Sequence, residues 1–250
     1  MQKQKPFRLI TIPVSHYCEK VRWTLDILKL PYVEEPHMPP FYRFATTKVG
    51  GESVPVLVTE DQVLTDSTDI LKYLDSIAPD DAKLYPVDSQ QLQEVEKLEE
   101  LFDKKLAVAV RDWAYFYIVD NSQIIKSKWT HDVPFFEKLL FPVFYPIMRS
   151  GVKNKYHINE ESAAQAYAQI ESIFAKVNGL LADGRNYLVG DKISAADITF
   201  ASLAAPILQP PQHPINSDSE ELPAEMLSKM KKIQETAAGK FVLNLYKNWR

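Results

Sequence analysis

The sequence predicts an α/β segment followed by an all-helical segment, because strand and helix patterns alternate only before residue 80. Runs of β-branched, aromatic and other apolar residues that are typical of strands lie at 7–12, 32–34, 54–58 and 62–64. The last two runs flank three polar residues and predict a β-hairpin. After Pro79–Pro86, which has the proline and charge content of a linker, strand patterns disappear and helical spacing continues.

Two helices are predicted among these strands. The first starts near Tyr17, has apolar residues on one face, and ends before Pro31. The second begins at Asp66 or Ser67 and also has an apolar face. Residues 39–52 are rich in proline and polar residues and are predicted to be a loop. We therefore expect domains at 1–80 and 89–250, joined by a linker at 81–88.

Helical spacing dominates the second segment, at residues 92–106, 167–177, 226–233 and 241–249. Residues 121–156 are rich in Phe, Tyr, Trp and Pro. We expect them to form either a lengthened helix pair with its own small core or a wall or cover of an apolar pocket. Pro206–Pro214 is predicted to be a rigid loop beside that pocket.

Composition excludes several classes of function. The formal charge of −4 does not suit nucleic acid, which binds clustered Lys and Arg. The longest apolar run, Leu139–Met148, is far shorter than the roughly 20 residues that cross a bilayer. The single cysteine, Cys18, excludes an internal disulfide and a multi-cysteine zinc site. Because the N-terminus also lacks a signal-peptide core, we expect a cytoplasmic protein without a metal.

Three motifs in this order resemble those of the glutathione transferase family. Ser15-His16-Tyr17-Cys18 lies between the first strand and the first helix. Ser53-Val54-Pro55-Val56-Leu57 resembles the Val-Pro segment before the family's hairpin. Leu64-Thr65-Asp66-Ser67 resembles the family's pair of an acidic residue and a serine at the start of the next helix. The resemblance implies a thioredoxin-like N-terminal domain followed by an all-helical C-terminal domain.

A fourth motif extends this resemblance into the helical segment. In Ser194-Ala195-Ala196-Asp197, Ser194 can cap the helix that follows, and Asp197 can reach back to the N–H of Ser194. The family has a similar box early in a buried helix. The role expected for Ser194 and Asp197 is structural, since losing such a cap costs about 1 kcal/mol.

The resemblance also implies a glutathione site. Val54 would offer its backbone N–H and C=O to the peptide, and Pro55 stands where the family has a cis proline. Asp66 and Ser67 would bind the γ-glutamyl end at the start of a helix. Lys48 is a candidate for the glycyl carboxylate, although this loop lacks the common Asn-Pro pair of the family.

An enzyme of this type must favour the thiolate of glutathione, whose thiol otherwise titrates near 8.5. Ser15, just before the first helix, is the first candidate to stabilise it with a hydroxyl. Tyr17 offers another hydroxyl in the same turn. Cys18 is the remaining rival, but compared with a Cys-x-x-Cys turn only its second cysteine is present, so we expect a half-buried packing residue.

The expected activity is addition of glutathione to small, apolar electrophiles, or reduction of an organic hydroperoxide. Arg111, Trp113, Tyr115 and Phe116 are the candidates for the second-substrate pocket. Two alternatives stay open: a non-catalytic protein of this fold that binds ligands or a partner through residues 121–156, and a thiol-disulfide enzyme that uses Cys18. By analogy with the family, we expect a homodimer.

Overall fold

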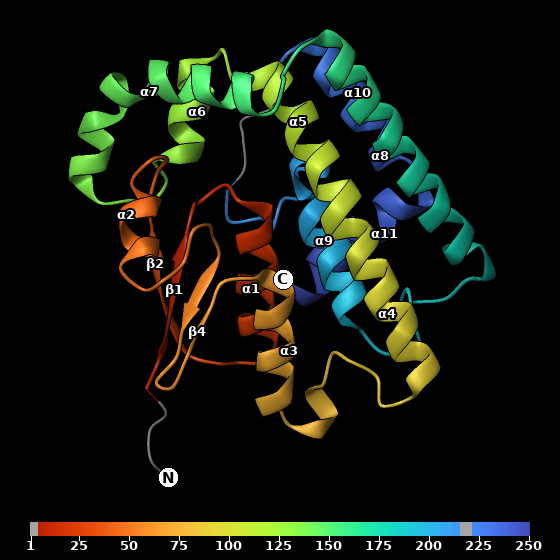
Figure 1. The fold of residues 1–250 in the computed structure, drawn as a ribbon. Helices are drawn as coiled ribbons and strands as arrows, with labels where there is room; N and C mark the ends of the chain where they lie inside the picture. The colour runs from red at the N-terminus through yellow and green to blue at the C-terminus, as the bar shows by residue number, and fades with distance from the viewer. Residues whose placement is uncertain (1–4, 216–221) are drawn as a thin grey trace.

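The computed structural model describes residues 5–215 and 222–250, and its N-terminal part is built on one small mixed sheet (Figure 1). The strands are β1 (Phe7–Thr11), β2 (Tyr32–Pro36), β3 (Val56–Val58) and β4 (Val63–Leu64), in the spatial order β2-β1-β3-β4. β1 pairs in parallel with β2 and antiparallel with β3, and β3 and β4 form the predicted hairpin. Val54 and Pro55 therefore lie just before the strand that enters the middle of the sheet.

Helices cover both faces of this sheet. Leu9 and Ile10 point to opposite faces of β1, because side chains alternate along a strand. Leu9 joins the large core beneath α1 (His16–Ile27) and α3 (Ser67–Ile77), whereas Ile10 packs with Ala45 of α2 (Tyr42–Thr47). The prediction of a loop over 39–52 was wrong, because α2 lies within it. Six residues are too few to show helical spacing against the prolines that precede them.

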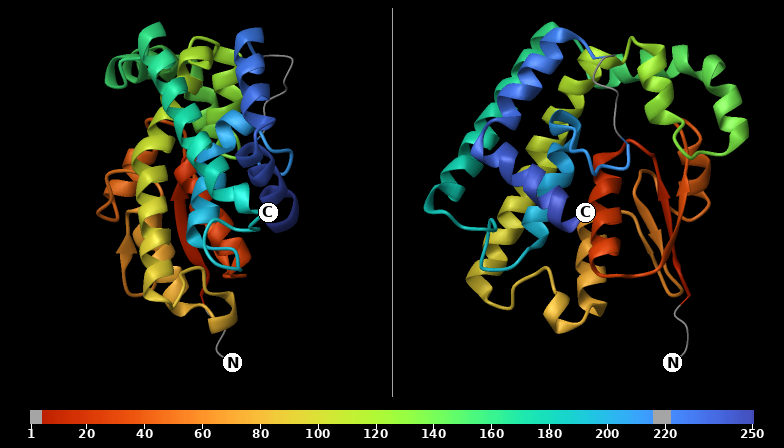
Figure 2. Two further views of the ribbon diagram at one scale, coloured as in Figure 1. Left: turned by 90° about the vertical axis from the view of Figure 1, so that its right-hand side faces the viewer. Right: turned by 180° about the vertical axis from the view of Figure 1, so that it is seen from behind.

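The remaining helices form one assembly beside the sheet (Figures 1 and 2). They are α4 (Ser89–Leu101), the π-helical turn η2 (Phe102–Leu106), α5 (Ala107–Ile118), α6 (Ser122–Trp129), α7 (Phe135–Lys155), α8 (Glu160–Leu180), α9 (Ala195–Leu208), α10 (Ala224–Gln234) and α11 (Ala237–Trp249). Short 3-10 turns lie at η1 (Asp80–Ala82) and η3 (Leu181–Asp183). Within residues 5–215 and 222–250, none of these helices combines the length and apolarity that crossing a bilayer requires.

The central helix of this assembly, α9, begins with the capping box expected at Ser194. The Asp197 carboxylate accepts hydrogen bonds from the Ser194 N–H at 2.8 Å and from its hydroxyl at 2.7 Å. The same carboxylate accepts the Leu188 N–H at 2.8 Å, which joins the preceding loop to the helix. Pro206, which was predicted to be in a loop, lies in the last turn of α9, and the loop starts at Gln209 instead.

The segment over 121–156 is a helix pair, α6 and α7. Ile124, Ile125 and Trp129 of α6 are buried and belong to the main core, so this pair has no separate core of its own. α7 contributes Phe141 to that core, and Phe144 packs edge-on against Phe41 beside α2, with ring centroids 5.2 Å apart. The pair therefore lies above α2 and connects the helical assembly to the far side of the sheet (Figure 1).

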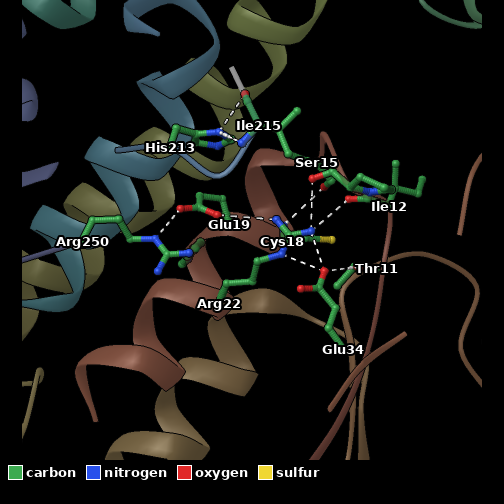
Figure 3. Close-up of polar contacts among 12 residues, drawn as sticks. Thr11, Ile12, Ser15, Cys18, Glu19, Arg22, Glu34, His213, Ile215 and Arg250 are labelled. Carbon is green, nitrogen blue, oxygen red and sulfur yellow. Dashed lines mark hydrogen bonds and ion pairs between the residues drawn. The ribbon is translucent and has the colours of Figure 1, made fainter. Parts of the chain in front are cut away.

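α1 lies between the sheet and the helical assembly, packed against α3 and α9, and several of its charged residues are buried. Lys20 Nζ contacts Glu99 at 3.2 Å, Asp103 at 3.0 Å and the Thr68 hydroxyl at 3.0 Å. Glu19 accepts a hydrogen bond from Arg250 at 2.7 Å, just beyond α11 (Figure 3). A buried charge is costly unless it is paired, so these contacts determine how the two parts join.

Replacing Lys20 with Met should lower the free energy of unfolding by about 3–5 kcal/mol, because Glu99 is left buried without its cation. Urea unfolding followed by circular dichroism measures this change. Lys232→Met is the matched control, since Lys232 pairs with Glu171 on the open surface, and its stability should equal that of the unmodified protein within error. Equal stability of the two variants would show that the Lys20 cluster does not hold the two parts together.

Candidate functional site

Two cavities open between the sheet and the helical assembly, and they share residues. The polar cavity, of about 600 Å³, is lined by Val54, Pro55, Asp66 and Ser67 on one side and by Glu96, Glu99, Glu100 and Asp103 on the other. The aromatic cavity, of about 300 Å³, is lined by residues that include Ser15, His16, Tyr42, Tyr115, Trp129 and Tyr156. Both cavities are lined by Tyr17, Ser53 and Val54, which marks where they meet.

The start of α3 forms one wall of the polar cavity. Asp66 caps the helix, and its Oδ1 accepts hydrogen bonds from the N–H groups of Thr68 at 2.8 Å and Asp69 at 3.2 Å. Among the described residues, neither Asp66 Oδ2 nor the Ser67 hydroxyl has a hydrogen-bond partner. A carboxylate oxygen that can pair with an ammonium therefore lies beside a hydroxyl at a helix N-terminus, where an anion is also favoured.

The Val54-Pro55 segment forms the next part of the wall. Its peptide bond is cis, the isomer implied by the resemblance. In the part of the chain that the structure describes, the Val54 N–H and C=O take part in no hydrogen bond. Because Val54 lines both cavities and precedes β3, these two groups can pair with an extended peptide as an added strand would.

Ser15 lies in the aromatic cavity, at the N-cap of α1. Its Oγ accepts the Cys18 N–H at a long 3.4 Å (Figure 3), so the hydroxyl can also donate to a ligand in the cavity. The Tyr17 hydroxyl already has a partner, because it donates a hydrogen bond of 2.8 Å to the Asp103 carbonyl at the π-helical turn. Burial and the nearby Asp103 raise the pKa of Tyr17 to about 12. Ser15 therefore has the more available hydroxyl.

Cys18 faces neither cavity. The sequence suggested a half-buried residue, but its side chain is fully buried beneath α1, and burial raises the pKa of the thiol. The neighbouring Arg22 and the Ser15 hydroxyl oppose that rise without cancelling it. Catalytic thiols need the thiolate and access to the substrate, and Cys18 has neither. The position of Cys18 is that of a residue that packs in the core.

The structure separates the four residues expected in the second-substrate pocket. Arg111 and Tyr115 of α5 line the aromatic cavity. Trp113 does not, because it is fully buried in the helical core against Tyr167, and Phe116 does not line the cavity either. On a helix, the side chains of neighbouring residues point about 100° apart, so only some residues of a consecutive series can face the same cavity. Lys48, expected at glutathione, is exposed after α2 and lines neither cavity.

Several cavity residues were not predicted. Lys128 and Trp129 come from α6, and Lys155 and Tyr156 from the end of α7. The sequence contained one signal for Lys128. This residue lies on the apolar face of α6 that Ile124, Ile125 and Trp129 define, where a lysine is unusual. The acidic wall of the polar cavity, from α4 and η2, gave no such signal, since its residues look like an ordinary solvated helix surface.

His16 also lines the aromatic cavity, and the sequence suggested no role for it. Its ring is buried, and within the part of the chain that the structure describes its Nε2 has no hydrogen-bond partner. Burial, together with the charges of Arg111 and His213, lowers its pKa to about 3, so the ring is neutral at physiological pH. Among the described residues, no group of three or more His, Cys, Asp or Glu side chains is arranged to hold a metal ion.

Comparison with known proteins agrees with this architecture. The family model "Glutathione S-transferase, N-terminal domain" matches residues 9–82, and "Glutathione S-transferase, C-terminal domain" matches 160–224, together more than half of the chain. Comparison with curated protein sequences gives no match.

Solved structures share the fold. The glutathione transferase GSTFuA3 from Phanerochaete chrysosporium has a TM-score of 0.64 at 18% identity, covering 99% of this chain and 98% of that one. CsGST63524 of Ceriporiopsis subvermispora, in complex with glutathione, has a TM-score of 0.63 at 20% identity, with 98% of each chain covered. A glutathione S-transferase from Methylobacterium radiotolerans, in complex with glutathione sulfonate, has a TM-score of 0.55 at 18% identity, covering 96% and 95%.

Burial of a neutral His16 predicts acid sensitivity. Its pKa is lower in the folded protein than in the unfolded chain, so stability is lost as the pH falls below about 6.5, at up to roughly 1.4 kcal/mol per pH unit. His16→Phe should reduce the slope of unfolding free energy against pH by about that amount between pH 6 and 4.5. Urea titrations at several pH values measure the slope. His157→Asn, at an exposed position with a left-handed φ of 51°, should leave it unchanged.

Proposed function

Because the chain belongs to the glutathione S-transferase family, we propose that it is a glutathione transferase that adds the glutathione thiolate to small, mostly apolar electrophiles. The same thiolate can also reduce an organic hydroperoxide at this site. The observation that carries the proposal is the meeting of the two cavities at Tyr17, Ser53 and Val54. A peptide in one cavity can place its thiol beside an apolar compound in the other.

The polar cavity supports binding of glutathione in one orientation. The γ-glutamyl end would lie at the start of α3, with its ammonium at Asp66 and its carboxylate at Ser67. The cysteinyl residue would pair with the backbone of Val54, and Pro55 would border it. From Val54 the cysteinyl side chain can point into the aromatic cavity, where Ser15 lies. Nothing comparable supports Lys48, which is absent from both linings.

Ser15 is the residue we assign to the thiolate. Lowering the pKa of a thiol by about two units requires about 2.7 kcal/mol. A hydrogen bond to a charged group supplies roughly 1.5–3 kcal/mol, and the N-terminus of a helix adds roughly 0.3–1 kcal/mol. The Ser15 hydroxyl at the N-cap of α1 combines both contributions. Tyr17 already donates its hydroxyl to Asp103, and the burial of Cys18 opposes a thiol-disulfide reaction.

An exposed apolar surface supports a second candidate, a protein of this fold that acts by binding a partner. The apolar face is made of six residues of α7 and one of α2, namely Phe135, Phe136, Leu139, Leu140, Val143, Ile147 and Phe44. Such a contiguous group is typical of an interaction surface. It spans both parts of the chain, since Phe41 beside α2 contacts Phe136 of α7, with ring centroids 5.8 Å apart.

Ser15→Ala should keep the affinity for glutathione and lose most of the turnover, because the peptide is held by Val54, Asp66 and Ser67 while the thiolate loses its donor. Glutathione affinity is measured by calorimetry and turnover with a chromogenic aryl halide. Cys18→Ala and Tyr17→Phe are the comparison variants and should retain most of the rate.

An unchanged rate in Ser15→Ala would remove Ser15 from catalysis. Loss of rate in Cys18→Ala, with Ser15→Ala active, would favour the thiol-disulfide alternative. Retention of glutathione without turnover of any model electrophile by the unmodified protein would favour the binding candidate.

We expect a homodimer in which the apolar faces of two copies pack against each other around a twofold axis. This contact removes several large apolar side chains of each copy from water. Size-exclusion chromatography with light scattering should give twice the chain mass of 28.6 kDa. Val143→Glu, at the centre of the face, should shift the protein to a monomer. Val87→Glu, which adds the same charge at an exposed site outside the face, should not. A monomer at all concentrations contradicts this expectation.

A further inference from the structure

Lys128 is a buried cation on the wall of the aromatic cavity. Its side chain lies on the apolar face of α6, between Ile124, Ile125 and Trp129, and only 5% of the residue is exposed. It lines the aromatic cavity but not the polar one. Among residues 5–215 and 222–250, no group forms a hydrogen bond or ion pair with its ammonium. A buried lysine without a partner is costly to the fold, so its retention calls for a reason outside the fold.

The charge on Lys128 survives its burial. Desolvation lowers its pKa to about 8, so the ammonium still carries its proton at neutral pH. Such a group attracts an anion strongly, because the surrounding dielectric is low and no counter-ion competes for it. The location of Lys128 in a cavity wall makes this attraction available to a ligand.

The rest of the cavity has the same preference for negative charge. Arg111 and Lys155 also line it, and among the described lining residues there is no Asp or Glu. Arg111 is already engaged, since its guanidinium bonds Asp112 at 2.9 Å and lies 3.8 Å from the centroid of the Tyr156 ring. Lys155 lies at 5.3 Å from the same ring and is exposed. Lys128 is thus the deepest of the three cations and the one without a partner in the described chain.

The other walls suit a flat apolar body. Tyr115 and Ile118 of α5 and Ile125 and Trp129 of α6 line the same cavity as Lys128. A volume of about 300 Å³ is at the lower end for small-molecule sites, which fits a compound of one or two rings. Aromatic and aliphatic walls with one buried ammonium match a ligand that has an apolar ring and a single negative group.

We propose that the aromatic cavity binds aromatic carboxylates, with the carboxylate paired to Lys128 and the rings held between the aromatic walls. This inference rests on the proposed function in one respect, which is that the compound bound there is the second substrate. The recognition itself requires only the cavity. The substrate class is an electrophile with an acidic group, and Lys128 is the residue that selects it.

The test compares 2-naphthoate with 2-naphthamide, which have the same rings and nearly the same shape but differ in charge. Binding to the full chain without glutathione is followed by quenching of tryptophan fluorescence and by calorimetry at pH 7. We expect naphthoate to bind at least about ten times more tightly than the amide, as charged hydrogen bonds allow. Lys128→Met should bind both compounds with equal affinity. Lys126→Met, which removes the same charge from the exposed face of α6, should keep the preference for naphthoate.

Other outcomes would overturn the proposal. Equal binding of the two compounds by the unmodified protein, or a preference that survives in Lys128→Met, would remove Lys128 from recognition. Weaker glutathione binding in Lys128→Met would assign the ammonium to a carboxylate of the peptide instead. A fall in melting temperature in this variant would show that the ammonium has a partner within the chain, whereas an equal or higher value supports a free charge. These readouts need no turnover, so they are independent of the Ser15→Ala result.

Discussion

The position of α1 depends on the pairing of its buried charges. Glu19, Lys20 and Arg22 are all buried, and a charge in such surroundings is costly without a partner. Arg22 finds Glu34 within the sheet part at 2.7 Å, but Lys20 and Glu19 find theirs on α4, η2 and beyond α11. The helical assembly can therefore join the sheet in one register only, because a shift would separate these pairs. Both cavities lie along this junction.

The two cavities differ in the kind of chemical group that lines them. The polar cavity presents backbone atoms of Val54 and the helix start at Asp66, which are features of the fold itself. The aromatic cavity is lined mainly by side chains, which come from the start of α1, from α2, α5, α6, α7 and α9, and from the loop after α9. The π-helical turn contributes where they meet, since the Asp103 carbonyl holds the Tyr17 hydroxyl and its carboxylate contacts Lys20. Such turns often occur at functional sites.

The α6 and α7 pair contributes both to the aromatic cavity and to the exposed surface. Its inner side supplies Lys128, Trp129 and Tyr156 to the aromatic cavity, and its outer side exposes the apolar face. A single segment thus bears on both the proposed ligand and the proposed partner.

The sequence by itself determined the strands, the helices α1 and α3, the capping box at Ser194 and the motifs at Ser15, Val54 and Asp66, because each depends on neighbours within a few residues. It did not reveal α2, which is too short for a periodic pattern, or that Trp113 turns into the core while Tyr115 faces the cavity. It also left Lys128 unassigned. Those outcomes depend on which helix faces meet, and only the tertiary structure decides this, since the contacts join residues that are up to 231 positions apart.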